Sequence, residues 1–230
     1  MNTIPEPTPT RNDALVTSSL PARVLVNLGC GGITPLRWIN TDKSWRLILK
    51  CFFPNNSPAP RIRYVNLAKR WPFPDGGVDV VYLSHVLEHL DEPTRKNVLN
   101  EAARVLKGGG VFRVVVPDLN QLCRNYLERF ERNDGNSAPQ LLYWLNLHRG
   151  NIYPRGRSWP KKLYDHLQGY PKQHLIMYDR LTLTAELALG HWTEIQFLEF
   201  GFSEWIPEIA DVEGGREICA SLYMEAIRKK

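Results

Sequence analysis

The feature that most constrains the fold is an apolar strand that ends abruptly in a glycine-rich loop. Residues 23–28, RVLVNL, are mostly apolar, which is typical of a strand buried in a sheet. Gly29, Cys30, Gly31 and Gly32 follow at once. Glycine has no Cβ, so the backbone can turn sharply there and come within contact distance of a ligand. A turn that only connects two elements is the alternative, but the preceding strand favours a binding site for a nucleotide-type cofactor.

The rest of the chain alternates between predicted strands and predicted helices. Apolar or partly alternating runs predict strands at 23–28, 37–40, 61–67, 78–84, 111–117, 193–200 and 221–229. Helices are predicted after the capping aspartates 91, 118 and 179, with a turn at 74–77, a brief helix at 44–53 and KGGG (107–110) ending the first capped helix. This alternation predicts an α/β fold with a doubly wound, mostly parallel sheet and a helical and loop insertion before the last strands.

Length and composition indicate one domain. The 230 residues, 43% hydrophobic and 23% charged, suit a single core, so we expect residues 1–20 to be a flexible lead and 21–230 to be the domain. Its insertion, about 131–178, is expected to cover the substrate. No stretch is apolar enough to span a membrane, and no signal peptide pattern is present. The four cysteines form no CxxC pair, which favours reduced thiols and a cytoplasmic location.

The positive charge is concentrated in one segment, residues 148–174. The chain carries a net charge of +5, and this segment holds six Lys/Arg and one acid, so it accounts for the whole excess. Tyr153, Trp159 and Tyr164 lie among the basic residues. We predict that the segment forms part of a cover over an acceptor pocket and selects an anionic acceptor. A solvated basic loop and a nucleic-acid contact are the alternatives.

The glycine loop does not fit the two best-known nucleotide motifs. The dinucleotide fingerprint needs a third glycine where Thr34 stands, and its acid comes about twenty residues later, whereas Asp42 comes sooner. No Gly-Lys-Ser/Thr follows the loop, so the phosphate-binding loop of ATPases is absent. Neither NAD nor ATP is favoured.

Four motifs in order resemble the class I S-adenosylmethionine-dependent methyltransferases. They are NLGCGG (27–32), WINTD (38–42), WPFPDGGVDVVYLSHVLEHL (71–90) and EAARVLKGGGVFRVVVPDL (101–119). The later QHLIMYDRLTL and SLYMEA are similar to a small bacterial subgroup associated with surface-polysaccharide and small-molecule pathways. The resemblance implies a Rossmann-like transferase with S-adenosyl-L-methionine as cofactor, acting in polysaccharide biosynthesis.

The resemblance also implies cofactor-binding residues. Those matching the loop at the methionyl part are Leu28, Gly29, Cys30 and Gly31. Asp42 matches the acid that accepts hydrogen bonds from both ribose hydroxyls. Asn66 and Leu67 match the position that meets adenine, although many relatives have aspartate in place of Asn66. Ser84 and His85 match the end of the strand beside the reacting sulfonium.

The predicted reaction is methyl transfer to a hydroxyl of a small molecule or glycan precursor. A hydroxyl acceptor needs a base, and His85 and His174 are the predicted catalytic residues, with His89 as a further candidate. The Asn/Asp-Pro-Pro-Tyr/Phe motif of nucleobase methylation is missing after the fourth strand, so nucleic acid is not the expected partner. A methyltransferase acting on RNA or another nucleic acid, or a catalytically silent cofactor-binding partner protein, is the alternative.

No metal site is predicted from the sequence. His85, Glu88 and His89 could converge as nitrogen and oxygen ligands across one helical turn, which is the alternative.

Overall fold

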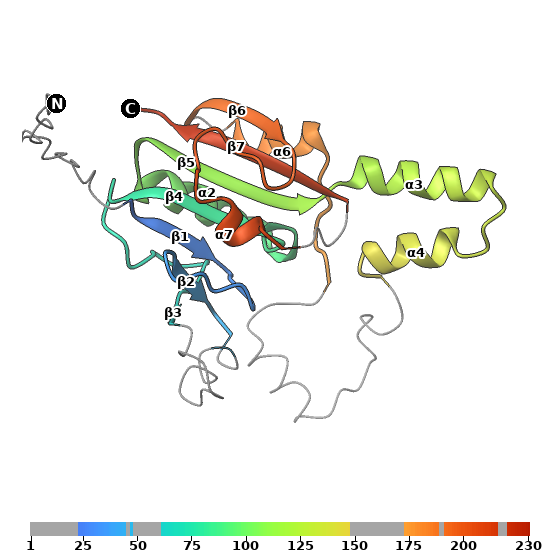
Figure 1. Cartoon of the computed structure of the whole chain (residues 1–230), viewed down its shortest axis with the longest axis horizontal. Helices are drawn as coiled ribbons and strands as arrows, with labels where there is room; N and C mark the ends of the chain where they lie inside the picture. The colour runs from blue at the N-terminus through green and yellow to red at the C-terminus, as the bar shows by residue number, and fades with distance from the viewer. Residues whose placement is uncertain (1–22, 45–46, 48–60, 148–172, 189–190, 216–219) are drawn as a thin grey trace, which may run out of the picture.

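The computed structural model describes residues 23–44, 47, 61–147, 173–188, 191–215 and 220–230. The predicted lead at 1–20, nearly all of the predicted helix at 44–53 and most of the basic segment 148–174 lie outside the described residues. Figure 1 shows a twisted sheet with helices on both faces and two helices, α3 and α4, that project beyond one end of the strands.

The described residues form a seven-stranded sheet in the order β3-β2-β1-β4-β5-β7-β6. The strands are β1 (Leu25–Leu28), β2 (Ile39–Asp42), β3 (Ile62–Tyr64), β4 (Val78–Ser84), β5 (Leu106–Pro117), β6 (Trp192–Leu198) and β7 (Ser221–Arg228). The pairs from β3 to β5 are all parallel, whereas β7 runs antiparallel to both β5 and β6. The predicted doubly wound, mostly parallel sheet is therefore confirmed, with one inverted strand that the sequence pattern did not predict.

Three of the described helices begin directly after the predicted capping aspartates. The described helices are η1 (Leu87–His89), α2 (Glu92–Val105), α3 (Leu119–Glu131), α4 (Ser137–Trp144), α6 (Arg180–Leu187) and α7 (Ala210–Glu213). Asp91 and Asp118 accept hydrogen bonds from first-turn amides, and Asp179 forms a capping box with Thr182. No helix of the described part is long and apolar enough to cross a membrane.

The helix before KGGG ends at about the predicted place, but the glycines do not form its cap. Helix α2 ends at Val105, and residues 107–110 belong to the irregular start of β5. Pairing along β5 moves from Leu106 to Val111 while the partner strand β4 advances only from Val78 to Val80. Gly109, with φ of +84°, lets the extra residues bulge out of the sheet.

The two faces of the sheet have separate cores. Alternate residues of β4 and β5 point to opposite faces, as strand geometry requires. One core packs α2 and α6 against the sheet, and the other packs α7 and the segment before it against the opposite face, as Figure 1 also shows. The layers are those of a helix–sheet–helix sandwich.

A buried ion cluster fixes α7 to the sheet. Arg113 of β5 is fully buried, and its guanidinium donates to both carboxylate oxygens of Glu213 at 2.8 and 2.6 Å. It also donates to Glu225 of β7 at 3.1 Å. Burial raises the pKa of Glu225 in spite of this bond. Because two acids share one arginine away from water, the position of α7 depends on Arg113.

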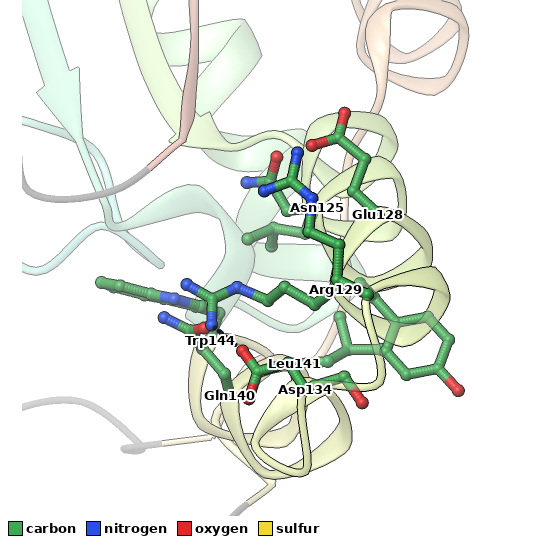
Figure 2. Close-up of a pocket in the computed structure, with 11 residues that line it drawn as sticks. Asn125, Glu128, Arg129, Asp134, Gln140, Leu141 and Trp144 are labelled. Carbon is green, nitrogen blue, oxygen red and sulfur yellow. Dashed lines mark hydrogen bonds and ion pairs between the residues drawn. The ribbon is translucent and has the colours of Figure 1, made fainter.

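Helices α3 and α4 enclose a polar hollow of about 460 Å³ outside the sheet. Figure 2 shows Arg129, Gln140 and Trp144 around this space, and Arg129 pairs with Asp134 at 2.7 Å. Helix α4 lies within the predicted insertion at 131–178, of which residues 131–147 and 173–178 are described. None of the residues predicted for the active site lines this hollow.

Candidate active site

A second cavity, of about 540 Å³, lies at the carboxyl ends of β1, β2 and β4. Ligands of open α/β sheets bind at this edge. The predicted cofactor-binding residues that line it are Gly29, Cys30, Gly31, Asp42, Asn66, Leu67, Ser84 and His85. Leu28 is fully buried beneath the loop and is not part of the lining. The cavity therefore brings together eight of the nine residues predicted for the cofactor.

The glycine loop has two positions that require glycine for different reasons. Gly29 and Gly31 have φ of +64° and +55°, a left-handed conformation that other residues rarely adopt. A Cβ on Gly29 would lie 2.6 Å from Val86 Cγ2, so close packing also excludes a side chain there. A Cβ on Gly31 would meet nothing within 4 Å. The space beside Gly31 is therefore part of the cavity and is not filled by other protein atoms.

Asp42 ties the glycine loop to the end of β2. Its Oδ2 accepts from the amide of Gly31 at 3.1 Å, and its Oδ1 accepts from the amide of Ser44 at 2.7 Å. The side chain lines the cavity although the residue is only 6% exposed. A carboxylate oxygen can accept more than one hydrogen bond, so both oxygens can still accept from a ligand.

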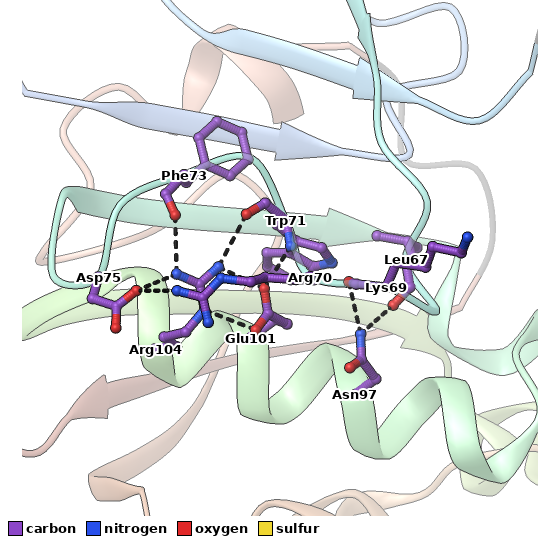
Figure 3. A network of polar contacts seen from close by, with 9 residues as sticks. All are labelled: Leu67, Lys69, Arg70, Trp71, Phe73, Asp75, Asn97, Glu101 and Arg104. Carbon is purple, nitrogen blue, oxygen red and sulfur yellow. Dashed lines mark hydrogen bonds and ion pairs between the residues drawn. The ribbon is translucent and has the colours of Figure 1, made fainter.

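Helix α2 holds the loop that carries Leu67 and Lys69, as Figure 3 shows. The side-chain amide of Asn97 donates to the carbonyl oxygens of Leu67 and Lys69 at 2.6 and 3.1 Å. The Asn66 carboxamide oxygen accepts from the amide of Ala68 at 3.1 Å, which orients this side chain within the loop.

Further along the same loop, Glu101 and Arg104 bind the backbone around Trp71. Glu101 accepts from the Trp71 amide at 2.6 Å, and Arg104 donates to the carbonyls of Trp71 and Phe73 at 3.1 and 3.0 Å (Figure 3). The hydrogen bond from Arg104 lowers the pKa of Glu101. The loop from β3 to β4 is thus fixed on α2 along much of its length, which positions one wall of the cavity.

His85 occupies the turn that follows β4. Its φ of +51° is unusual for a residue with a side chain, and its amide donates to the carbonyl of Val115 at 2.9 Å. Its Nε2 lies 3.3 Å from the Ser221 hydroxyl, and its Nδ1 lies 3.3 Å from a carboxylate oxygen of Glu88. The side chain is 26% exposed and lines the cavity, so His85 can exchange a proton with a molecule bound there.

Behind His85 lies a group of polar side chains, of which Glu88 and His89 are buried and His174 is half-buried. Glu88 is fully buried, and neither of its carboxylate oxygens has a hydrogen-bond partner. The rings of His89 and His174 meet edge to face with centroids 4.8 Å apart. Burial lowers the pKa of His174 to about 4, against the opposing effect of the Glu88 carboxylate. His174 is therefore neutral at pH 7.

The two predicted catalytic histidines are placed differently. His85 lines the cavity, whereas His174 does not and instead adjoins Glu88 and His89. Sequence reasoning considered Glu88 beside His85 and His89 but did not associate it with His174, which is 86 positions later in the chain. The sequence signal that was available for this polar group is the unusual pattern His-x-x-Glu-His, which directly follows a buried strand.

Comparison with known proteins places this site in a methyltransferase domain. A methyltransferase domain family matches residues 26–114, which contain the glycine loop, Asp42 and His85. A structure described as an S-adenosylmethionine-dependent methyltransferase, possible histamine N-methyltransferase, from Thermotoga maritima is similar to this chain with a TM-score of 0.51 and 18% identity. The alignment covers 92% of this chain and 84% of that one, and it agrees with the fold described above.

Two further structures align over most of the chain. A protein from Pyrococcus horikoshii has a TM-score of 0.49 and 18% identity, covering 90% of this chain and 84% of that one. A putative methyltransferase in complex with the Trm112 activator from Haloferax volcanii has a TM-score of 0.49 and 13% identity, covering 91% and 84%. The domain match identifies residues 26–114 as a methyltransferase domain, for which S-adenosylmethionine is the implied cofactor, and the structural likeness agrees with the fold.

Proposed function

We propose that this S-adenosylmethionine-dependent methyltransferase methylates a hydroxyl group of a small molecule or glycan precursor. The observation that carries the proposal is that one cavity contains the glycine loop, the Asp42 carboxylate and the His85 imidazole. A cofactor bound along the first two would present its reactive end toward the third. The widely spaced cysteines fit a reducing compartment, so the proposal includes the cytoplasm as the location.

The chemistry of the cavity fits the cofactor. Its volume of about 540 Å³ lies within the range of roughly 300–1,000 Å³ that is usual for small-molecule sites. We assign the methionyl part to the loop of Gly29 and Gly31, where the missing side chain of Gly31 leaves room. We assign the ribose hydroxyls to Asp42, and adenine to the wall formed by Asn66 and Leu67.

Methyl transfer places few demands on the protein beyond alignment and removal of a proton. When bound, the cofactor would supply an electrophilic methyl group on a cationic sulfur; the sulfur would keep the electron pair of the broken S–C bond as the acceptor oxygen forms the new O–C bond. The enzyme holds the acceptor in line and excludes water. We assign the hydroxyl proton to the neutral imidazole of His85, and the nearby Glu88 carboxylate would stabilise the imidazolium that forms.

The preference for an anionic acceptor rests on residues 148–174. The role of their six basic residues remains a sequence-based prediction, because all six lie outside the described part. The end of the segment is described: the Gln173 carbonyl lies 3.0 Å from His89 Nδ1, and Leu175 lines the cavity. The described residues at and just after the end of the segment therefore reach the candidate active site, which supports the predicted role in acceptor selection.

The experiment has a binding arm and a transfer arm. Calorimetric titration with S-adenosylhomocysteine tests the cofactor site. Labelled S-adenosylmethionine is then offered with sugar nucleotides, lipid-linked glycans, small phenols and total RNA. Label in an ether of a small acceptor or glycan supports the proposal. Label in RNA alone, or binding without transfer to any acceptor, contradicts it and favours one of the two alternative functions.

A histidine pair tests the assignment of the base. His85→Ala is expected to lower kcat by roughly 10²- to 10⁴-fold, the range for a lost general base, with little change in S-adenosylhomocysteine affinity. His191→Ala is the control, because this histidine is outside the cavity lining and its carbonyl bond to Lys229 does not involve the side chain. Equal activity of the two variants would exclude His85 as the base.

A further inference from the structure

The buried carboxylate of Glu88 lies among nitrogen atoms from two distant segments. Glu88 and His89 belong to η1, and His174 lies in the irregular segment that precedes α6. The two segments are bonded directly, because the Glu88 carbonyl accepts from the amides of Leu175 and Ile176 at 2.7 and 3.3 Å. The backbone therefore holds the three side chains against one another.

The side chains offer acceptor atoms to a common point. One potential ligand atom from each of Glu88, His89 and His174 lies within 4.8 Å of the other two. The His89 Nδ1 lies 3.0 Å from the carbonyl of Gln173, so Nδ1 carries the proton and Nε2 presents a lone pair. A carbonyl that fixes the far nitrogen in this way is typical of metal-binding histidines.

Protonation of a nearby histidine would not satisfy all the buried polar atoms of this group. A charged His85 would balance Glu88, since its Nδ1 is 3.3 Å from the carboxylate. The Nδ1 of His174, however, is buried and has no hydrogen-bond partner, and both Glu88 oxygens also have none. Unsatisfied polar atoms that are this well buried are costly, and a bound cation would satisfy them together.

We propose that Glu88, His89 and His174 bind a divalent transition-metal ion of the zinc type. Two imidazoles and one carboxylate form a ligand set that zinc uses in proteins, with an open position for a further ligand. Zinc holds such ligands at about 2.0–2.2 Å, so small side-chain rotations would draw the three atoms closer. His89 and Leu175 line the cavity, so an ion here would lie beside the acceptor end of the active site.

This site departs from the sequence-based expectation of no metal, and its ligand set differs from the alternative of His85, Glu88 and His89. Because the third ligand is His174 and not His85, His85 stays available for the proton transfer assigned to it above. The metal site itself does not depend on the identity of the acceptor.

The full chain, stripped of metal by dialysis against a chelator, is titrated with Zn²⁺ by calorimetry in competition with a chromophoric chelator. One equivalent is expected to bind. Glu88→Gln and His174→Ala are expected to weaken binding by about 100-fold or more, since even partners that only orient metal ligands are worth roughly 10- to 100-fold. Substituted Co²⁺ is expected to show the visible absorption of a tetrahedral site in wild type and to lose it in both variants.

Two controls separate this site from adventitious binding. His191→Ala removes a histidine elsewhere in the structure, and Cys123→Ser removes an exposed thiol, so both are expected to bind Zn²⁺ as wild type does. S-adenosylhomocysteine affinity is measured on the same samples, so failure of the metal site and failure of the cofactor site are distinguishable. Circular dichroism of the metal-free proteins checks folding, and His174→Gln replaces His174→Ala if the alanine variant does not fold.

The proposal is overturned by any of three results. The first is that wild-type protein binds no Zn²⁺ in the competition assay. The second is that Glu88→Gln and the folded His174 variant bind Zn²⁺ as tightly as wild type. The third is that either control variant loses Zn²⁺ binding.

Discussion

Substitution of Gly31 is expected to remove cofactor binding without preventing folding. The left-handed φ of +55° costs a residue with a side chain about 1–2 kcal/mol. A Cβ at Gly31 meets nothing within 4 Å, so no clash adds to this strain. Against a total stability of about 5–15 kcal/mol, the Gly31→Ala and Gly31→Val proteins remain folded. The valine side chain occupies cavity space, so the affinity for S-adenosylhomocysteine is expected to fall by at least about tenfold, or about 1.4 kcal/mol.

Gly29→Ala is the matched control for this argument. It has the same left-handed strain, and in addition its Cβ would lie 2.6 Å from Val86 Cγ2. Overpacking of this kind costs about 1–3 kcal/mol, so Gly29→Ala is expected to lose about 2–5 kcal/mol in total. Urea unfolding measures both stabilities, and calorimetry measures both affinities. The reasoning is refuted if Gly31→Val binds S-adenosylhomocysteine as wild type does, or if Gly31→Ala is less stable than Gly29→Ala.

Three other substitutions test separate parts of the structure. Asp42→Ala is expected to weaken S-adenosylhomocysteine binding by about 1.5–3 kcal/mol in calorimetry, and to lower stability by about 1–3 kcal/mol in urea because two backbone amides lose their acceptor; unchanged affinity would remove Asp42 from the site. Joint replacement of Arg155 and Arg157 by glutamate is expected to raise the KM for an anionic acceptor and to flatten its salt dependence, with cofactor affinity retained; wild-type kinetics at low salt would contradict the predicted role. Arg113→Met is expected to cost about 3–5 kcal/mol in urea unfolding, because two buried carboxylates lose their counter-ion; a smaller loss than for Asp42→Ala would show that the ion cluster does not fix α7.

Local signals in the sequence predicted the elements that surround the cavity. The apolar run at 78–84 coincides with β4, and the aspartates at 91, 118 and 179 cap helices. These predictions succeed because a buried strand and a capped helix are each encoded by neighbouring residues. The cavity residues were predicted from the resemblance to methyltransferases, and they meet because the carboxyl ends of parallel strands lie at one edge of the sheet.

Features that depend on distant parts of the chain were not predictable in this way. The inverted direction of β7 depends on its partners β5 and β6, and no short motif encodes it. KGGG is typical of a helix end, but the competing demand of pairing with β4 makes it a bulge. The approach of His174 to Glu88 depends on a backbone contact between segments 86 positions apart. Periodicity and spacing contain no information on such contacts.

The place of β7 between β5 and β6 also determines the order in which this sheet can be assembled. Strand β6 precedes β7 in the chain, yet in the described sheet β6 pairs only with β7. During synthesis β6 therefore emerges before the strand that it needs, and the edge of β5 stays open until β7 arrives. Pairing that bridges the long stretch from β5 to β7 is slow, and open strand edges are prone to aggregate. The yield of folded protein on expression is thus expected to depend on how quickly residues 221–228 pair with β5 and β6. Substitutions in this strand are expected to slow folding and lower the yield without altering the active site.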